Sequence, residues 1–406
     1  MAKILISLLG TGKQAKNDNS NNRYETTDYL LDGKLYENLT FSSNVIIKHY
    51  NIDKLFFIGT NASMWDNVAE VFEADENYIF EILEKKENKV LNENDLSNLN
   101  ELIDKKLNFI GSKCIIIKDG ENEDELWSIF EKFLEILHSL NENDEIYFDI
   151  THLFRSVSVM SFIIAELSQI GKNIKFGGMF YGMLKKGEPS KIIDISVFFE
   201  LLEWVKAIDE IERFASFEKF LKLSDRIVDQ KTQNYIKTLD EAFSIANMSA
   251  IYNSIKRLKE NINSIKSNDD KIFAFILPRI EKFINELTAK SLSSFQFKIA
   301  NFFAKRGMYS IAYIALAEAV ISYICEKEGY SIDSEDDRKK AKNIIRSYQK
   351  SGGNRQKLYK IFFKQINRIR NNIAHQLNTT KQPKDDIKNF DKYFKESKEY
   401  LKNIFN

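Results

Sequence analysis

Short apolar runs alternate with helix-like segments in the first half of the chain. Runs that are typical of buried strands cover Lys3–Leu9, Leu55–Gly59, Cys114–Ile117, Glu145–Ile150, Ile174–Met183 and Ile192–Ile195. Apolar residues at three- and four-residue spacing predict helices over Trp65–Glu84, Glu125–Leu140 and near Val157–Ile170. Strands that alternate with helices are typical of a largely parallel sheet with both faces covered. The pattern therefore predicts an α/β domain.

One early segment departs from this alternation. Lys13–Arg23 is polar throughout and is expected to be a loop, because it has no apolar face to bury. It is followed by Tyr24–Leu31 and Lys34–Tyr36, which flank Asp32-Gly33. Asp-Gly is preferred chemistry for a tight two-residue turn, so these segments are predicted to form a hairpin.

Beyond about residue 197 the apolar spacing is almost entirely helical. Lys266–Asp270 is polar and is expected to connect two helices. We place the major boundary near 197 and a softer one near 290. The expected organisation is a ligand-sensing α/β domain over 1–197, a helical connector over 198–290 and a helical domain over 291–406.

Composition limits the function classes. The 406 residues carry 59 basic and 59 acidic side chains, so the formal net charge is zero, which argues against a generic nucleic-acid coat. Cys114 and Cys325 lie far apart and suggest neither a disulfide framework nor a metal site, so a reducing cytoplasm fits. The run Ile4–Leu9 is too short for a signal segment, and we expect no membrane-spanning stretch and no cofactor or metal.

A candidate catalytic set lies near the C-terminus. Its predicted helix has an apolar stripe formed by Leu358, Phe362, Ile366, Ile369 and Ile373. With Ile369 at zero on a helical wheel, Arg370 falls near 100° and His375 near 240°. Small Ala374 and Asn371 lie between them. This spacing places Arg370 and His375 away from the core and permits close approach of the same helix from a second subunit.

This set suits cleavage of RNA by its own 2′-hydroxyl without a metal. Arg370 would bind phosphate and stabilise charge in the transition state. His375 would transfer a proton, and Asn371, four residues earlier, would orient its ring. The alternative is a surface Arg and a helix-terminal His without chemistry, which is the more common outcome for such spacing alone. Lys364 and Arg368 either attract RNA phosphate or form an ordinary solvated face.

A second constellation follows the predicted strand Glu145–Ile150. Asp149–Ser156 supplies hydroxyls, backbone N–H groups at a helix start and a guanidinium, which are groups that bind phosphate. Two more loops follow strands that should end at the same sheet edge, where open α/β sheets bind ligands. The candidate ligand-binding residues are Gly10, Thr11, Gly12, Thr60, Asn61, Ser63, Asp149, Thr151, His152, Phe154, Arg155 and Ser156.

Each loop alone could also be a simple capped turn, and only their combination favours a ligand site. Gly10, Gly12 and Ala15 formally fit a dinucleotide fingerprint, which we reject because the following segment cannot form the required helix. His152 is expected to anchor its loop by hydrogen bonds, with a ligand contact as the alternative. The three tryptophans, Trp65, Trp127 and Trp204, are expected in cores or interfaces.

These motifs resemble two known families. Arg370–His375 is similar to the R-x4-H motif of HEPN ribonucleases, and Gly307–Ala319 is similar to the first helix of that family. Asp149–Ser156 resembles the D-x-T-H-G-F-R-S signature of CARF domains of type III CRISPR systems, with Leu153 where that family usually has Gly. Gly59–Trp65 resembles a second CARF loop.

The resemblance implies a Rossmann-like CARF domain followed by an all-helical HEPN domain. Proteins of that architecture are homodimeric endoribonucleases that cut single-stranded RNA in antiviral defence when a cyclic oligoadenylate binds. It favours cyclic tetra-adenylate, leaves cyclic hexa-adenylate open, and does not decide whether the CARF domain slowly degrades its activator. The alternative is a CARF sensor that binds nucleic acid or protein without cleaving; a toxin-like nuclease without a ligand is a third reading, which Asp149–Ser156 disfavours.

Overall fold

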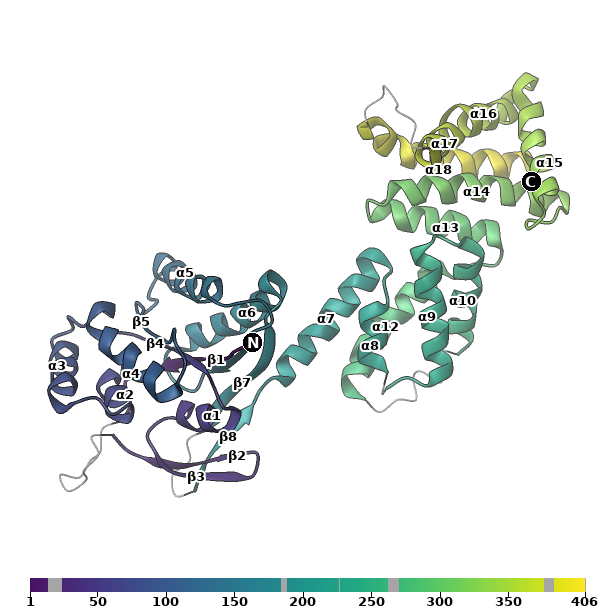
Figure 1. The fold of residues 1–406 in the computed structure, drawn as a ribbon. Helices are drawn as coiled ribbons and strands as arrows, with labels where there is room; N and C mark the ends of the chain where they lie inside the picture. The colour runs from purple at the N-terminus through teal and green to yellow at the C-terminus, as the bar shows by residue number, and fades with distance from the viewer. Residues whose placement is uncertain (14–23, 184–187, 226, 262–269, 376–382, 406) are drawn as a thin grey trace. The chain divides into compact units, whose positions relative to one another are not determined.

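The computed structural model describes residues 1–13, 24–183, 188–225, 227–261, 270–375 and 383–405 (Figure 1). The chain divides into two compact units, Met1–Phe198 and Phe199–Asn406. The first is an α/β unit and the second is all-helical, as the apolar patterns predict.

The first unit is built on one eight-stranded sheet. Its order is β3-β2-β8-β7-β6-β1-β4-β5, with antiparallel pairing only at β2/β3 and β7/β8 within the described residues. The strands are β1 Lys3–Leu9, β2 Thr27–Leu31, β3 Lys34–Leu39, β4 Lys54–Gly59, β5 Lys113–Ile116, β6 Glu145–Asp149, β7 Lys175–Met183 and β8 Ser190–Asp194. The central strands β1, β4 and β6 are buried on both faces, which explains their continuous apolar runs.

Alternating residues of the central strands face two separate helical layers. Leu5, Leu9 and Phe57 belong to one buried cluster with residues of α1, α2, α3 and α4, whereas Ile4 and Ile6 do not, so they lie on the other face. The helices are α1 Ser43–Tyr50, α2 Trp65–Val71, α3 Glu76–Glu87, η1 Glu93–Leu96, α4 Ser97–Leu107, α5 Glu123–Ser139 and α6 Arg155–Lys172. Figure 1 shows α5 and α6 together on the opposite side of the sheet from α1.

The expected hairpin is confirmed, and one expected helix is wrong. Asp32 and Gly33 have φ values of 48° and 77°, as a tight two-residue turn between β2 and β3 requires. The single helix predicted over Trp65–Glu84 is instead α2 and α3. Glu73 adopts φ of 60°, and the Asp75 carboxylate accepts a hydrogen bond from the backbone N–H of Tyr78 at the start of α3. A left-handed residue followed by an N-cap ends one helix and begins the next.

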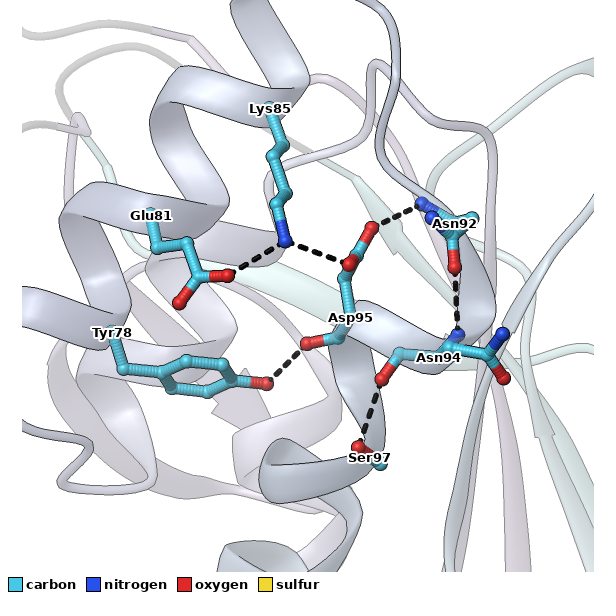
Figure 2. A network of polar contacts seen from close by, with 7 residues as sticks. All are labelled: Tyr78, Glu81, Lys85, Asn92, Asn94, Asp95 and Ser97. Carbon is cyan, nitrogen blue, oxygen red and sulfur yellow. Dashed lines mark hydrogen bonds and ion pairs between the residues drawn. The ribbon is translucent and has the colours of Figure 1, made fainter.

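A polar network fastens η1 to α3 beside the sheet (Figure 2). Lys85 on α3 contacts Glu81 at 2.6 Å and Asp95 of η1 at 2.7 Å. The Tyr78 hydroxyl donates to the backbone carbonyl of Asp95 at 2.7 Å. The hydrogen bond from Lys85 is the main cause that lowers the pKa of Asp95. The network therefore fixes the segment between α3 and α4.

The second unit contains helices throughout its described part. They are α7 Val197–Phe214, α8 Glu218–Ser224, α9 Gln230–Ser244, α10 Met248–Glu260, α12 Lys271–Leu287, α13 Leu292–Lys305, α14 Tyr309–Glu328, α15 Glu335–Ser347, η2 Tyr348–Lys350, α16 Gly353–Ile361, η3 Phe362–Ile366, α17 Asn367–His375 and α18 Pro383–Phe405. One continuous hydrophobic core joins α7 through α18, and it shows no break near residue 290 in the described residues. The domain division expected there stays a prediction. The predicted Lys266–Asp270 loop lies outside the described residues except Asp270, which caps α12.

The central helix of this unit is α14. By length and composition it could cross a membrane, so the expectation that no apolar stretch reaches that length was wrong among the described residues. Most of α14 is buried, and it packs against α13, α15, α17 and α18, as a core helix does. Trp65 and Trp204 are buried in cores as expected, whereas Trp127 is 59% exposed on α5.

Candidate functional site

Three loops meet at the carboxyl edge of the sheet. They follow β1, β4 and β6, which are neighbours in the strand order, so their carboxyl ends open at the same place. The loops line a cavity of 880 Å³. Eight of the predicted ligand-binding residues line it: Gly10, Thr11, Gly12, Thr60, Ser63, Thr151, His152 and Phe154. Three loops that are far apart in the sequence therefore line one cavity, at the sheet edge where the strand pattern placed them.

The other four predicted residues lie elsewhere. Asn61 lines an adjacent cavity of 370 Å³ and donates from its amide to the carbonyl of Lys89 at 3.4 Å. Asp149 is completely buried below the cavity. Arg155 and Ser156 are exposed in the first turn of α6, next to the cavity rim at Phe154. Their contact with a ligand stays a prediction.

Asp149 organises the loop that follows β6. Its carboxylate accepts hydrogen bonds from the Ser42 hydroxyl at 2.8 Å, the Thr151 hydroxyl at 2.5 Å and the Thr151 backbone N–H at 3.1 Å. The Thr151 hydroxyl also accepts from the backbone N–H of Gly182 at 2.8 Å. A fully buried carboxylate needs such partners. Asp149 and Thr151 are therefore committed to fixing the loop.

Ser63 plays the same part in the loop after β4. Its hydroxyl donates to the carbonyl of Leu9 at 2.6 Å and accepts from the backbone N–H of Thr60 at 2.9 Å. The Trp65 indole N–H donates to the carbonyl of Thr60 at 2.8 Å. These bonds tie the second loop to the end of β1.

His152 differs from the expectation of a hydrogen-bonded anchor. Its Nε2 atom is buried and has no hydrogen-bond partner among the described residues, and the side chain lines the cavity. Burial lowers the pKa of His152, and the charge of Asp149 opposes this shift. A buried polar atom without a partner is costly, so the imidazole is available to a ligand.

Leu153, the departure from the CARF signature, keeps the backbone that glycine would adopt. Its φ is 75°, in the left-handed region where a Cβ is unfavourable. The following helix α6 begins at Arg155 as expected. Leucine in this conformation costs about 1–2 kcal/mol.

The opposite wall of the cavity was missed by sequence reasoning. It is formed by residues at and after the polar loop and before α1, including Tyr24, Glu25, Thr26, Thr27, Tyr29 and Thr40. The Tyr24 hydroxyl donates to Asp66 at 2.9 Å, and Lys86 contacts the same carboxylate at 2.5 Å. A Cβ on Gly12 would lie 2.6 Å from the Tyr24 ring, so glycine is required there. In the sequence, the change from the polar run Lys13–Arg23 to the aromatic residue Tyr24 was the feature that could have indicated this part of the cavity wall.

The cavity wall supplies mainly hydroxyl and backbone groups for hydrogen bonds, and few charged side chains. Lys13 lines it but pairs with Glu25 at 2.6 Å. Within the described lining no other cation occurs. An anionic ligand would depend here on hydrogen-bond donors, with Arg155 exposed just beyond the rim.

The helix α17 carries the predicted catalytic motif. Ile369 is buried, and Ile373 packs against the same core, as the helical wheel predicts. Arg370 is 34% exposed, and its Nη1 donates to the Asn371 side-chain oxygen at 3.2 Å. His375 is the last residue of α17, and its side chain lies outside the described part of the structure. The relation of its imidazole to Arg370 stays a prediction.

Glu318 on α14 is a site residue that the sequence did not identify as such. Its carboxylate lies 3.9 Å from Nη2 of Arg370 and also pairs with Arg338. The signal was the carboxylate of Glu318 in the middle of the otherwise uncharged run Tyr309–Cys325, since a partly buried charge needs a partner. Glu318 therefore places a carboxylate beside the Arg370 guanidinium from the neighbouring helix.

The turn before α17 is also unusual. Phe362–Ile366 is π-helical, so a continuous helical run from Gly353 to His375 contains one widened turn. Such turns often occur at functional sites. Among the described residues, no group of three or more His, Cys, Asp or Glu side chains is arranged to hold a metal ion.

Similar proteins cover different parts of the chain. Residues 4–181 match the family described as the CARF domain of the CRISPR system endoribonuclease Csx1, and residues 200–293 match the second domain of the CRISPR-associated protein MJ1674. MJ1674 of Methanocaldococcus jannaschii is 31% identical over 409 residues, which cover 92% of this chain and 62% of that protein. The chain thus spans less than two thirds of the length of this curated relative.

A solved structure also aligns with the whole chain. Enterococcus italicus Csm6 bound to cyclic hexa-2'-fluoro-hexa-dAMP matches with 14% sequence identity and a TM-score of 0.42, over 100% of this chain and 94% of its own.

The sheet and the cavity at its carboxyl edge define the first unit as a Rossmann-like ligand-binding domain. The family matches make residues 4–181 similar to a CARF domain and residues 200–293 similar to the second domain of a CRISPR-associated protein, which agrees with this architecture. The predicted fold class, an α/β Rossmann-like domain followed by a helical region, is confirmed.

Proposed function

We propose that the chain is a single-stranded RNA endoribonuclease of type III CRISPR defence, activated by a cyclic oligoadenylate and independent of metal. One observation carries the proposal. The same chain combines a CARF cavity, where Nε2 of His152 has no hydrogen-bond partner among the described residues, with a helix that carries Arg370 five residues and Asn371 four residues before His375. The first supplies a place for a signal, and the second supplies chemistry for RNA.

The proposed reaction is attack of an RNA 2′-oxygen on the adjacent phosphorus, with departure of the 5′-oxygen. The 2′-hydroxyl loses a proton and the departing 5′-oxygen gains one; His375 of one subunit makes the first transfer and His375 of the second subunit makes the other. Arg370 stabilises the charge that develops on the phosphoryl oxygens. Glu318 positions Arg370, and the products carry a 2′,3′-cyclic phosphate and a 5′-hydroxyl. The protein's residues perform every step.

The proposed working form is a homodimer in the cytoplasm. The outer face of α6 presents an exposed apolar stripe of Val159, Ile163, Leu167 and Ile170, and Phe154, just before this helix, is exposed and lines the cavity. Apolar residues in such a row favour burial against another surface. A second copy on this stripe would complete the cavity around a two-fold symmetric ring. Cyclic tetra-adenylate is the favoured activator, with the hexa-adenylate as the next candidate.

The test uses end-labelled single-stranded RNA in the presence of a chelator. Wild type and His375→Ala are incubated without ligand, with cyclic tetra-adenylate and with cyclic hexa-adenylate. We expect cleavage only with one of the rings, and none by the variant. Equal cleavage by the variant would remove His375 from the mechanism. Ring binding without any cleavage would favour a sensor that acts by binding alone.

A further inference from the structure

A groove on the second unit lies outside the catalytic motif and has no assigned role. It has a volume of 680 Å³ and is lined by residues of α16, η3 and α18 together with Gln349. The helices α16 and α18 pack against each other (Figure 1). The helix α17 continues directly from η3. Lys364 in the groove precedes Arg370 by six residues, which is roughly 9 Å along a helix axis.

The groove is basic in a protein with no net charge. Its lining contains four lysines, Lys357, Lys360, Lys364 and Lys392, and a single carboxylate, that of Glu396. Within the described part of the chain, none of these lysines forms an ion pair. Elsewhere in the same unit Lys339 and Lys340 are paired with nearby carboxylates. The groove therefore presents uncompensated positive charge to solvent.

Aromatic rings stand between these lysines. Tyr359, Tyr393 and Tyr400 line the groove and are partly buried. The Tyr393 hydroxyl donates to the Gln365 side-chain oxygen at 3.1 Å, and the ammonium of Lys357 lies 5.7 Å from the centre of the Tyr400 ring. These contacts fix two rings in the wall of the groove. Positive charge for phosphates, combined with rings on which bases stack, is the chemistry that binds single-stranded nucleic acid.

We infer that this groove holds single-stranded RNA and delivers it to α17. The inference rests on the proposed function, because it places the substrate beside the same helix. The lysines contact phosphates and the tyrosines stack bases, so recognition is tolerant of sequence. A duplex would not fit this chemistry, because its bases are already stacked on one another.

The test measures binding without cleavage. A fluorescent 2′-O-methyl RNA strand, which lacks the attacking hydroxyl, is titrated into the full-length protein at several salt concentrations. The groove variant is Lys360→Ala, Lys364→Ala and Lys392→Ala combined. Its control is Lys388→Ala, Lys395→Ala and Lys402→Ala, which removes the same charge from exposed positions of α18 outside the groove.

We expect the groove variant to bind at least about tenfold more weakly, with a salt slope smaller by about 2, since each lost phosphate contact contributes roughly 0.7. The control should stay within about threefold of wild type. Tyr400→Ala should weaken binding by roughly 5- to 150-fold, whereas Tyr400→Phe, which keeps the ring, should not. Circular dichroism of each variant checks that the helices are retained.

Equal losses in the groove variant and the control would overturn the inference, as would absence of RNA binding by wild type. The inference would also be overturned if duplex RNA or polyglutamate displaced the labelled strand as well as unlabelled single-stranded RNA does. The groove would then bind anions in general. Failure of the proposed function is distinguishable. In that case the 2′-O-methyl strand binds in the groove, but ordinary RNA is not cut, or is cut equally by His375→Ala.

Discussion

The buried Nε2 atom of His152, which has no partner in the described part of the chain, predicts opposite effects on stability and on ligand binding. The His152 side chain lines the 880 Å³ cavity, and no described residue forms a hydrogen bond with this atom. An unsatisfied buried polar atom costs about 1–3 kcal/mol. His152→Phe keeps a flat ring and removes that atom. The ligand-free unit should therefore become more stable by about that amount.

Ligand affinity should change in the other direction. If a group of the cyclic oligoadenylate pairs with Nε2, its loss weakens binding by about 1–3 kcal/mol, or roughly 5- to 150-fold. Isothermal titration measures the affinity, and native-state hydrogen exchange of β1 and β6 measures the opening free energy of this unit. His138→Phe, at an exposed position of α5, is the control and should alter neither. Reduced protection without ligand, combined with unchanged affinity, would refute this reasoning.

Three further outcomes follow from the hairpin turn, the cavity and the catalytic motif. Gly33→Ala should lower the free energy of unfolding by about 1–2 kcal/mol, because only its φ of 77° is unfavourable for alanine. Gly12→Ala should lower it by roughly 1–3 kcal/mol more, because the new Cβ overlaps the Tyr24 ring, and it should also weaken ligand binding. Hydrogen exchange measures the stability and titration measures the binding. Glu318→Ala should lower kcat for RNA by about 10- to 100-fold with little change in KM, because Arg370 loses its positioning contact; an unchanged kcat would exclude that role. The pKa of His152 is lower in the folded chain than its ordinary value of 6.5, so the unfolded chain binds the proton first as the pH falls. Protection against hydrogen exchange should therefore fall as the pH drops from about 6.5 towards the folded pKa.

The pH response should reverse in the presence of ligand. A polyanion in the cavity favours protonated His152, so binding should take up a proton and tighten as pH falls. Titrations in two buffers of different ionisation enthalpy measure that uptake. Binding without proton uptake near pH 6 would show that the anionic ligand does not interact with the His152 imidazole.

Local patterns were sufficient for most of the first unit. The strands β1, β4 and β6 are buried on both faces, so their apolar runs are continuous and their ends are marked by Gly or polar residues. Because neighbouring parallel strands end at one edge, the loops around Gly10, Thr60 and Thr151 could be brought together without knowing the structure.

Features that depend on distant contacts were not predictable. Glu318 meets Arg370 only because α14 packs against α17. Tyr24 reaches the cavity because β2 and β3 extend the sheet beyond β8, a pairing that no local spacing encodes. The break between α2 and α3 depends on the left-handed Glu73, a residue type with no special preference for that conformation.

The most direct test of the account is the single-turnover rate of RNA cleavage in chelator, with and without saturating cyclic tetra-adenylate or hexa-adenylate. The account predicts a rate at least tenfold higher (a change of roughly 1.4 kcal/mol) with one ring and products that end in a 2′,3′-cyclic phosphate. His152→Phe should need more ring to reach that rate, and Arg370→Ala should not reach it. Equal rates with and without both rings, or cleavage that stops when metal is removed, would contradict the account.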